Sequence, residues 1–200
     1  MPRPRLALTL SMFLAASSVI AQQAYRPPDP HVMARLSYGS SGMAQRGDLR
    51  HVCVAVDRDG AYRIVRRLDD GQTQRLHGKM SKEELQRLST LLGTAEFRNL
   101  SGDHGGLIRQ QSESFVAEVP SAGRALDGTG VSLEPEAWHL QWLNGDGENP
   151  FPLSVGKVVD WLQHFQPKDG KPFQYAEYPD VCPAAGLRLL QPSVAENSQP

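Results

Sequence analysis

Short stretches in which apolar and polar residues alternate recur along the chain, and this period is typical of strands that bury one face. The pattern predicts strands over residues 32–38, 51–56, 61–68, 73–79, 107–120 and 137–143. In the second stretch Val52, Val54 and Val56 share one face. In the last, Trp138 and Trp142 share a face, where we expect them to pack in a core rather than to stack on a sugar.

The apolar period changes to that of a helix in two places. Ser81 and Glu84 form a capping box, and leucines then recur at helical spacing until Gly93, which supplies a stop. Residues 94–97 start a further short turn, and the apolar stripe of residues 154–165 predicts a second amphipathic helix. This order of elements predicts a single α+β domain over residues 32–165, an antiparallel meander sheet with two amphipathic helices on one face.

The N-terminus has the pattern of a targeting signal. Arg3 and Arg5 precede the apolar run Leu6–Ala16, and small residues lead to a cleavage site near Ala21. We therefore expect residues 1–21 to be a signal peptide and the proline-containing residues 22–31 to be an extended lead-in. The sequence contains no other apolar run long enough to span a bilayer.

Composition narrows the class of protein. Charged residues make up 22% of the chain and the formal net charge is -1, which argues against a disordered polyelectrolyte and against a nucleic-acid binder. The 16 arginines against 5 lysines suggest a GC-rich bacterial genome, so we expect a periplasmic or extracellular protein. The expected partner is another exported or envelope protein.

Export would place the two cysteines, Cys53 and Cys182, in an oxidising compartment. We expect them to form one disulfide, which would tie the proline-rich tail of residues 166–200 back onto a strand. Residues 186–190 of that tail are a possible edge strand. Because neither cysteine has a basic neighbour or a glycine-rich setting that would lower its pKa, a catalytic thiol is not expected.

The most site-like residues are Asp103 and His104, in a predicted glycine-rich loop at 101–106, because such a pair can ligate a metal or transfer protons. The histidines show no metal-ligand spacing, and the chain has no nucleophile elbow, P-loop or dinucleotide fingerprint. Residues 57–60 and 144–148 lack the later ligands of a calcium loop. We therefore assign no catalytic, cofactor or metal site and expect no cofactor.

These observations favour a non-enzymatic binding domain. Loops 39–48 and 101–106 are the expected contact surface, because loops on a rigid sheet often carry recognition. The candidate binding residues are Ser40, Ser41, Gly42, Met43, Asp103 and His104. Two alternatives remain open, a small hydrolase that uses the His104 loop and a structural component of the envelope.

Several short motifs also resemble emfourin-like exported bacterial proteins. They are Leu36–Tyr38 with Ser41–Ala44, the helix opening Ser81–Glu84, Ala95–Leu100, and Val158–Leu162. The resemblance covers residues 32–165, and some members of that family inhibit thermolysin-type metalloproteases, so it implies a further alternative, a protease inhibitor. Met43 stands where the family pattern has an aromatic residue, and the tail around Cys182 has no counterpart in the pattern.

Overall fold

The computed structural model describes residues 31–42, 49–105, 109, 111–119, 138–178 and 181–183. The expected signal peptide, nearly all of the lead-in and the possible edge strand at 186–190 lie outside the described residues. In chain order the elements are β1 (Val32–Ser41), β2 (Leu49–Asp57), β3 (Ala61–Leu68), β4 (Thr73–Lys79), α1 (Lys82–Gly93), α2 (Ala95–Arg98), β5 (Gly102–Gly105), β6 (Ser112–Val119), β7 (Trp138–Gly145), α3 (Leu153–His164), β8 (Lys171–Pro172) and η2 (Tyr175–Glu177).

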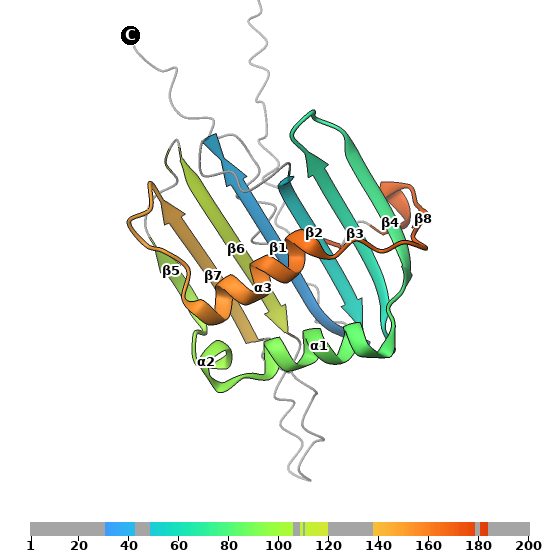
Figure 1. Ribbon diagram of the computed structural model, residues 1–200, viewed down its shortest axis with the longest axis horizontal. Coiled ribbons are helices and arrows are strands. Elements are labelled where there is room, and N and C mark those ends of the chain that lie inside the picture. The colour runs from blue at the N-terminus through green and yellow to red at the C-terminus, as the bar shows by residue number, and fades with distance from the viewer. Residues whose placement is uncertain are drawn as a thin grey trace, which may run out of the picture.

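The described strands form one eight-stranded sheet in the order β5-β7-β6-β1-β2-β3-β4-β8 (Figure 1). Neighbours pair antiparallel except β5 and β7, which are parallel. A mostly antiparallel sheet together with three helices among the described residues confirms the expected α+β class. The sheet as a whole is not a simple meander, because β6 returns to the second edge of β1 and places the first strand in the interior of the sheet.

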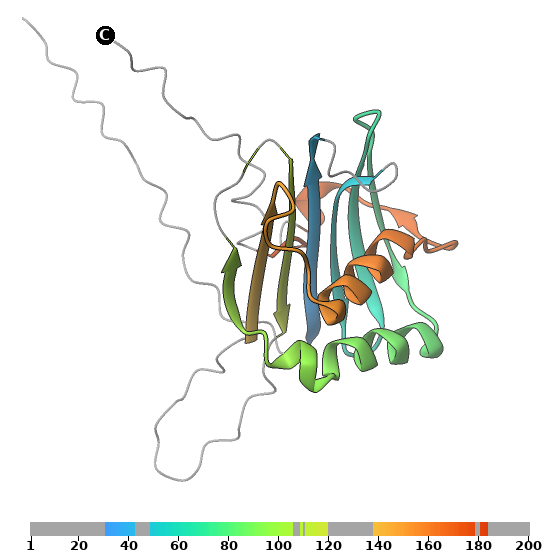
Figure 2. The same cartoon turned by 60° about the vertical axis from the view of Figure 1, so that its left-hand side comes forward.

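The three helices lie against one face of the sheet (Figure 2). The largest apolar cluster lies between them, and on α3 it includes Val158 and Leu162. Trp138 and Trp142 point to this face, as expected for core residues. Trp142 belongs to the cluster, and Trp138 packs against Phe97 of α2 with ring centroids 5.0 Å apart.

The expected helix start at Ser81 is confirmed, because the Ser81 hydroxyl accepts a hydrogen bond from the Glu84 amide at 3.1 Å. The Glu84 side chain does not return to the cap as the capping box predicts. Its carboxylate instead accepts a hydrogen bond from the Trp161 indole of α3 and thereby connects α1 with α3.

Three sequence-based boundaries were wrong, and pairing partners explain each difference. The predicted loop at 101–106 contains β5, which pairs with β7 and has positive φ at Gly102 and Gly105. The strand expected over 107–120 begins only at Ser112. β1 continues through the predicted turn at Gly39 to Ser41, because β2 and then β6 pair with it there.

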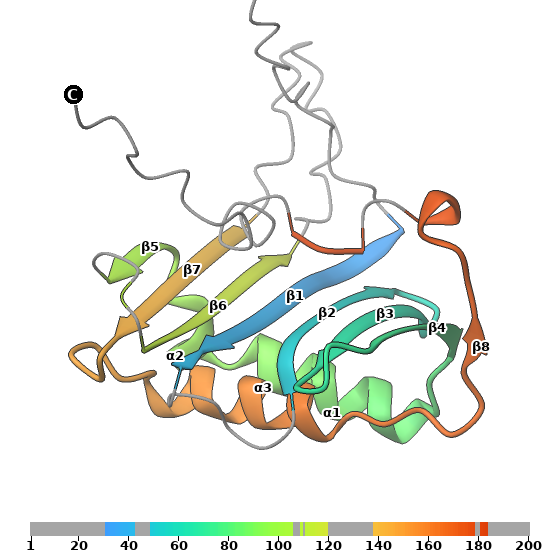
Figure 3. The ribbon, with the colours of Figure 1, turned by 90° about the horizontal axis from the view of Figure 1, so that it is seen from above.

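The opposite face of the sheet is covered in part by the chain after α3, which passes round the β4 edge (Figure 3). The expected disulfide is present between Cys53 and Cys182, whose Cα atoms are 5.0 Å apart. Phe173 and Val181 pack beside it in a small second apolar cluster. No helix in the described ranges is both long and apolar enough to cross a membrane. The disulfide fits an exported protein.

Candidate functional site

Several chain segments meet at one end of the sheet, which we call the Ser41 end. β1, β5 and β7 finish there and β6 begins there, because Ser41 pairs with Ser112 and Ser112 pairs with Gly145. Ser41, from the predicted loop 39–48, and Gly105, from the predicted loop 101–106, therefore lie at the same end of the sheet. Three strand spacings separate β1 from β5, which is about 14 Å.

A buried carboxylate lies at this end, on the face that the helices cover. Glu113 of β6 is only 5% exposed, and it follows the same alternation as Phe115 and Ala117 of the core. The Tyr38 hydroxyl donates to Glu113 Oε1 at 2.9 Å, and Asn144 Nδ2 donates to Oε2 at 3.3 Å. These hydrogen bonds join β1, β6 and β7 through a group that would be costly to bury unpaired.

The same network continues into the connection between β7 and α3. Asn144 Oδ1 accepts from the Asn149 amide at 3.2 Å, and the Asn149 carbonyl accepts from the Trp142 indole at 3.0 Å. Phe151 then packs edge-on against Tyr38, with ring centroids 6.4 Å apart. The connection is thus fixed at several points immediately before Leu153, the first residue of α3, whose side chain is 77% exposed.

The predicted binding residues of the first loop lie at the edge of this network. Ser41 Oγ accepts from the Ser112 amide at 3.1 Å, and Ser40 lies opposite Glu113 in the register. Gly42 is exposed and has a φ of 62°. Met43 lies outside the described residues.

Asp103 and His104 do not converge, because adjacent residues of β5 point to opposite faces. The His104 ring stacks on Trp142 with centroids 4.6 Å apart, and its Nε2 lies 3.2 Å from the Leu100 carbonyl oxygen. Asp103 turns the other way, and its Oδ1 lies 3.1 Å from His139 Nε2. The pair therefore forms no acid–base dyad in this geometry.

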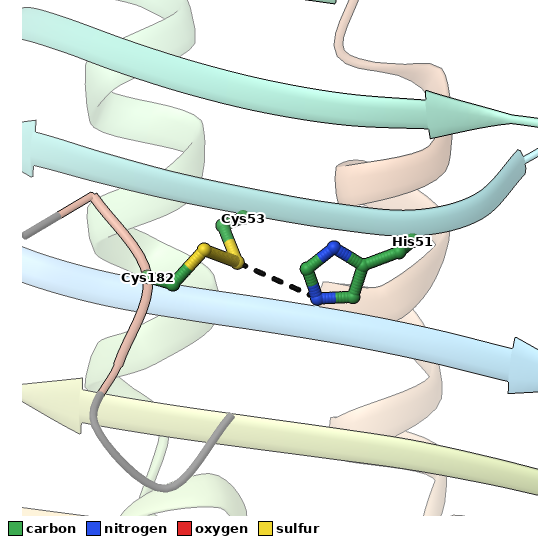
Figure 4. The surroundings of a disulfide bond; sticks show 3 residues. All are labelled: His51, Cys53 and Cys182. Atoms are coloured by element: carbon green, nitrogen blue, oxygen red, sulfur yellow. Dashed lines mark hydrogen bonds between the residues drawn. A yellow bond between two sulfur atoms is a disulfide. The ribbon is translucent and has the colours of Figure 1, made fainter. Parts of the chain in front are cut away.

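A histidine that the sequence did not single out lies beside the disulfide (Figure 4). His51 is 7% exposed, and its Nε2 lies 3.5 Å from Cys53 Sγ. Cys53 therefore does have a basic residue as a neighbour in the folded chain, contrary to the expectation from the sequence. Burial, and then the charge of Arg67, lower the pKa of His51 to about 4, so the ring is neutral near pH 7 and supplies no positive charge to the sulfur.

The described residues also form a pocket on the helix side of the molecule. It lies between α1 and α3, has a volume of about 240 Å³, and is lined by residues that include Glu84, Trp161 and His164. Nowhere in the described ranges do three or more His, Cys, Asp or Glu side chains gather as a metal site.

The chain was compared with models of protein families and with curated proteins. No model of a protein family matches it, and no curated protein matches it. The physical arrangement at the Ser41 end therefore carries the functional argument.

Proposed function

We propose that the chain is an exported, non-enzymatic binding domain that recognises another exported or envelope protein through the Ser41 end of its sheet. The observation that carries the proposal is the hydrogen-bonded network from Tyr38 and Glu113 to Asn149. It holds three strand ends and the connection to α3 in one arrangement, next to the exposed Leu153. A surface that is rigid before binding loses less conformational entropy when a partner docks.

Support for export comes from the disulfide and from the N-terminal sequence. A disulfide between residues 129 positions apart persists in an oxidising compartment rather than in the cytosol. The run Leu6–Ala16 with its preceding arginines has the length and charge of a signal peptide. Amino-terminal sequencing of the secreted or periplasmic protein should find Gln22 as the first residue.

Two alternatives have less support. A hydrolase centred on His104 needs Asp103 or another group to orient the imidazole, whereas Asp103 points to the opposite face. An envelope structural component would present a broad apolar patch. Among the described residues, Leu153 is the one large hydrophobic side chain that is exposed, which is a point contact rather than a patch.

The proposal is tested by capture from the periplasmic or culture-medium fraction with three forms of the mature chain. They are the wild type, Leu153→Asp and Ser89→Asp, the last being a matched new charge on the exposed side of α1. We expect one protein to bind the wild type and Ser89→Asp and to be lost with Leu153→Asp. Capture of the same proteins by all three forms, or of none by the wild type, would oppose the proposal.

The motif resemblance to emfourin-like proteins supports a particular partner class, a thermolysin-type metalloprotease. The test is a titration of such a protease with the mature chain in a peptide-cleavage assay. Inhibition at a one-to-one ratio by uncleaved chain would support this partner. Full protease activity at excess chain would rule out a metalloprotease as the partner. The capture experiment would then decide whether the chain is a binding domain.

A further inference from the structure

One buried cation lies outside the network described above. Arg66 of β3 is 7% exposed and lies opposite Val52 in the register. It follows Tyr62 and Ile64 in the alternation of β3, and both of these belong to the core between sheet and helices. A guanidinium thus occupies a position where the pattern of the strand calls for an apolar side chain.

The guanidinium is without acceptors along one edge. In the part of the chain that the structure describes, Arg66 Nε and Nη2 are both buried and neither has a hydrogen-bond partner. These two nitrogens form the side-on fork of arginine, in which two parallel N–H groups match the two oxygens of a carboxylate or phosphate. Burial also lowers the pKa of Arg66, which reflects the cost of a charge without a counter-ion.

Carboxylates near this end of the described sheet have other partners. Asp69, in the turn after β3, pairs with Arg50 at 2.5 Å, and Glu113 accepts from Tyr38 and Asn144. Gln74, the residue of β4 directly opposite Arg66, is exposed, so the strand beside Arg66 is open to solvent. A ligand can therefore approach over β4.

A second buried donor without an acceptor lies on α3, on the face of the sheet that the helices cover. Gln163, in the last turn of α3, has a buried Nε2 that makes no hydrogen bond within the described residues. α3 covers the face of the sheet to which Arg66 points. Among the described residues, the buried polar atoms without a partner on the helix-covered face are therefore all N–H donors. An anion can accept hydrogen bonds from such groups.

We propose that Arg66 is the anchor of an anion site that takes an oxyanion group of a ligand, a carboxylate or a phosphate, bidentate on its Nε–Nη2 fork. A carboxylate is the better fit, since one negative charge neutralises the buried cation. Binding then supplies the acceptors that the isolated chain lacks. The site does not depend on the partner proposed for the Ser41 end.

The test is the thermal unfolding temperature, Tm, of the mature chain in sodium acetate, sodium phosphate and sodium chloride at equal ionic strength. At ten times the dissociation constant, we expect an oxyanion to raise Tm by about 3–6 °C relative to chloride. Acetate as the stronger ligand would assign a carboxylate, and phosphate as the stronger ligand would assign a phosphoryl group.

Two arginine variants separate the site from general charge effects. Arg66→Met keeps the aliphatic length, should lose the response to oxyanions, and should raise Tm in chloride by about 3 °C or more, because it removes an unpaired buried charge. Arg67→Met removes the neighbouring exposed arginine, which points to the opposite face, and should keep the response. No oxyanion effect in the wild type, or an equal effect in Arg66→Met, would overturn the proposal.

A direct readout does not depend on the folding of a variant. The Nε–H signal of Arg66 in a nitrogen–proton NMR spectrum should shift on titration with acetate or phosphate and should saturate. A signal that does not move, while Tm responds, would place the anion elsewhere.

Discussion

Removal of the disulfide is the perturbation whose magnitude follows most directly from the structure. Cys53 and Cys182 are 129 positions apart, so the bond closes most of the described fold into one loop. The loss of chain entropy in the unfolded state for a loop of this size corresponds to about 5 kcal/mol of stabilisation. We therefore expect Cys182→Ala to lower the free energy of unfolding by about 5 kcal/mol.

Cys182→Ala is preferred to a change at Cys53 because Cys53 is fully buried and its thiol then keeps its packing. The assay is urea unfolding of the mature chain, followed by tryptophan fluorescence. The dependence of the free energy on urea should become steeper, since the unfolded chain without the cross-link exposes more surface. Wild-type protein in excess reductant is the matched control and should reach the same midpoint as the variant. An unchanged midpoint in both samples would refute the reasoning.

Three further predictions concern stability. Glu113→Ala should cost about 3 kcal/mol in urea unfolding, because it leaves two buried donors without their acceptor, and Glu113→Gln should cost less. Gly105→Ala should lower Tm far more than Gly102→Ala. Both glycines have positive φ, but a Cβ at Gly105 would overlap the Leu143 carbonyl oxygen, whereas one at Gly102 would meet nothing. Equal shifts in Tm would contradict this packing. Burial holds the folded pKa of His51 at about 4, below its usual 6.5, so the free energy of unfolding should fall by about 3 kcal/mol as the pH drops from about 6.5 to 4. In His51→Gln, the urea midpoint should not show this fall over the same pH range.

Local pattern predicted most of the elements. The alternation through Val52, Val54 and Val56 marks β2, and the cap at Ser81 marks the start of α1, since both signals depend on neighbours in the chain. Composition misled at β5, because Gly102 and Gly105 are typical of a loop and the pairing with β7 is made about 40 residues away in sequence. The position of β6 beside β1 could not be predicted for the same reason, because the two strands lie far apart in the sequence and no local pattern shows that they pair.

The residues of the proposed site were harder to predict than the fold. Ser40 and Ser41 do lie at the end of the sheet, but the residues that brace it were not singled out. Glu113 and Arg66 each carry a charge at a core-facing position of an otherwise apolar alternation. That mismatch is visible in the sequence, and it is the signal that could have found both residues. His51 differs, because its contact with the disulfide requires the strand to be known.

If the Ser41 end is rigid before any partner binds, backbone hydrogen exchange of the free mature chain will show it. The Asn149 amide donates to Asn144 Oδ1 inside the network, whereas the Gln72 amide donates to Asp70 Oδ1 in an exposed turn. We predict that the Asn149 amide exchanges about 100-fold or more slowly than the Gln72 amide, because an amide inside a hydrogen-bonded network opens less often than one in an exposed turn. Equal exchange rates at the two amides would contradict it.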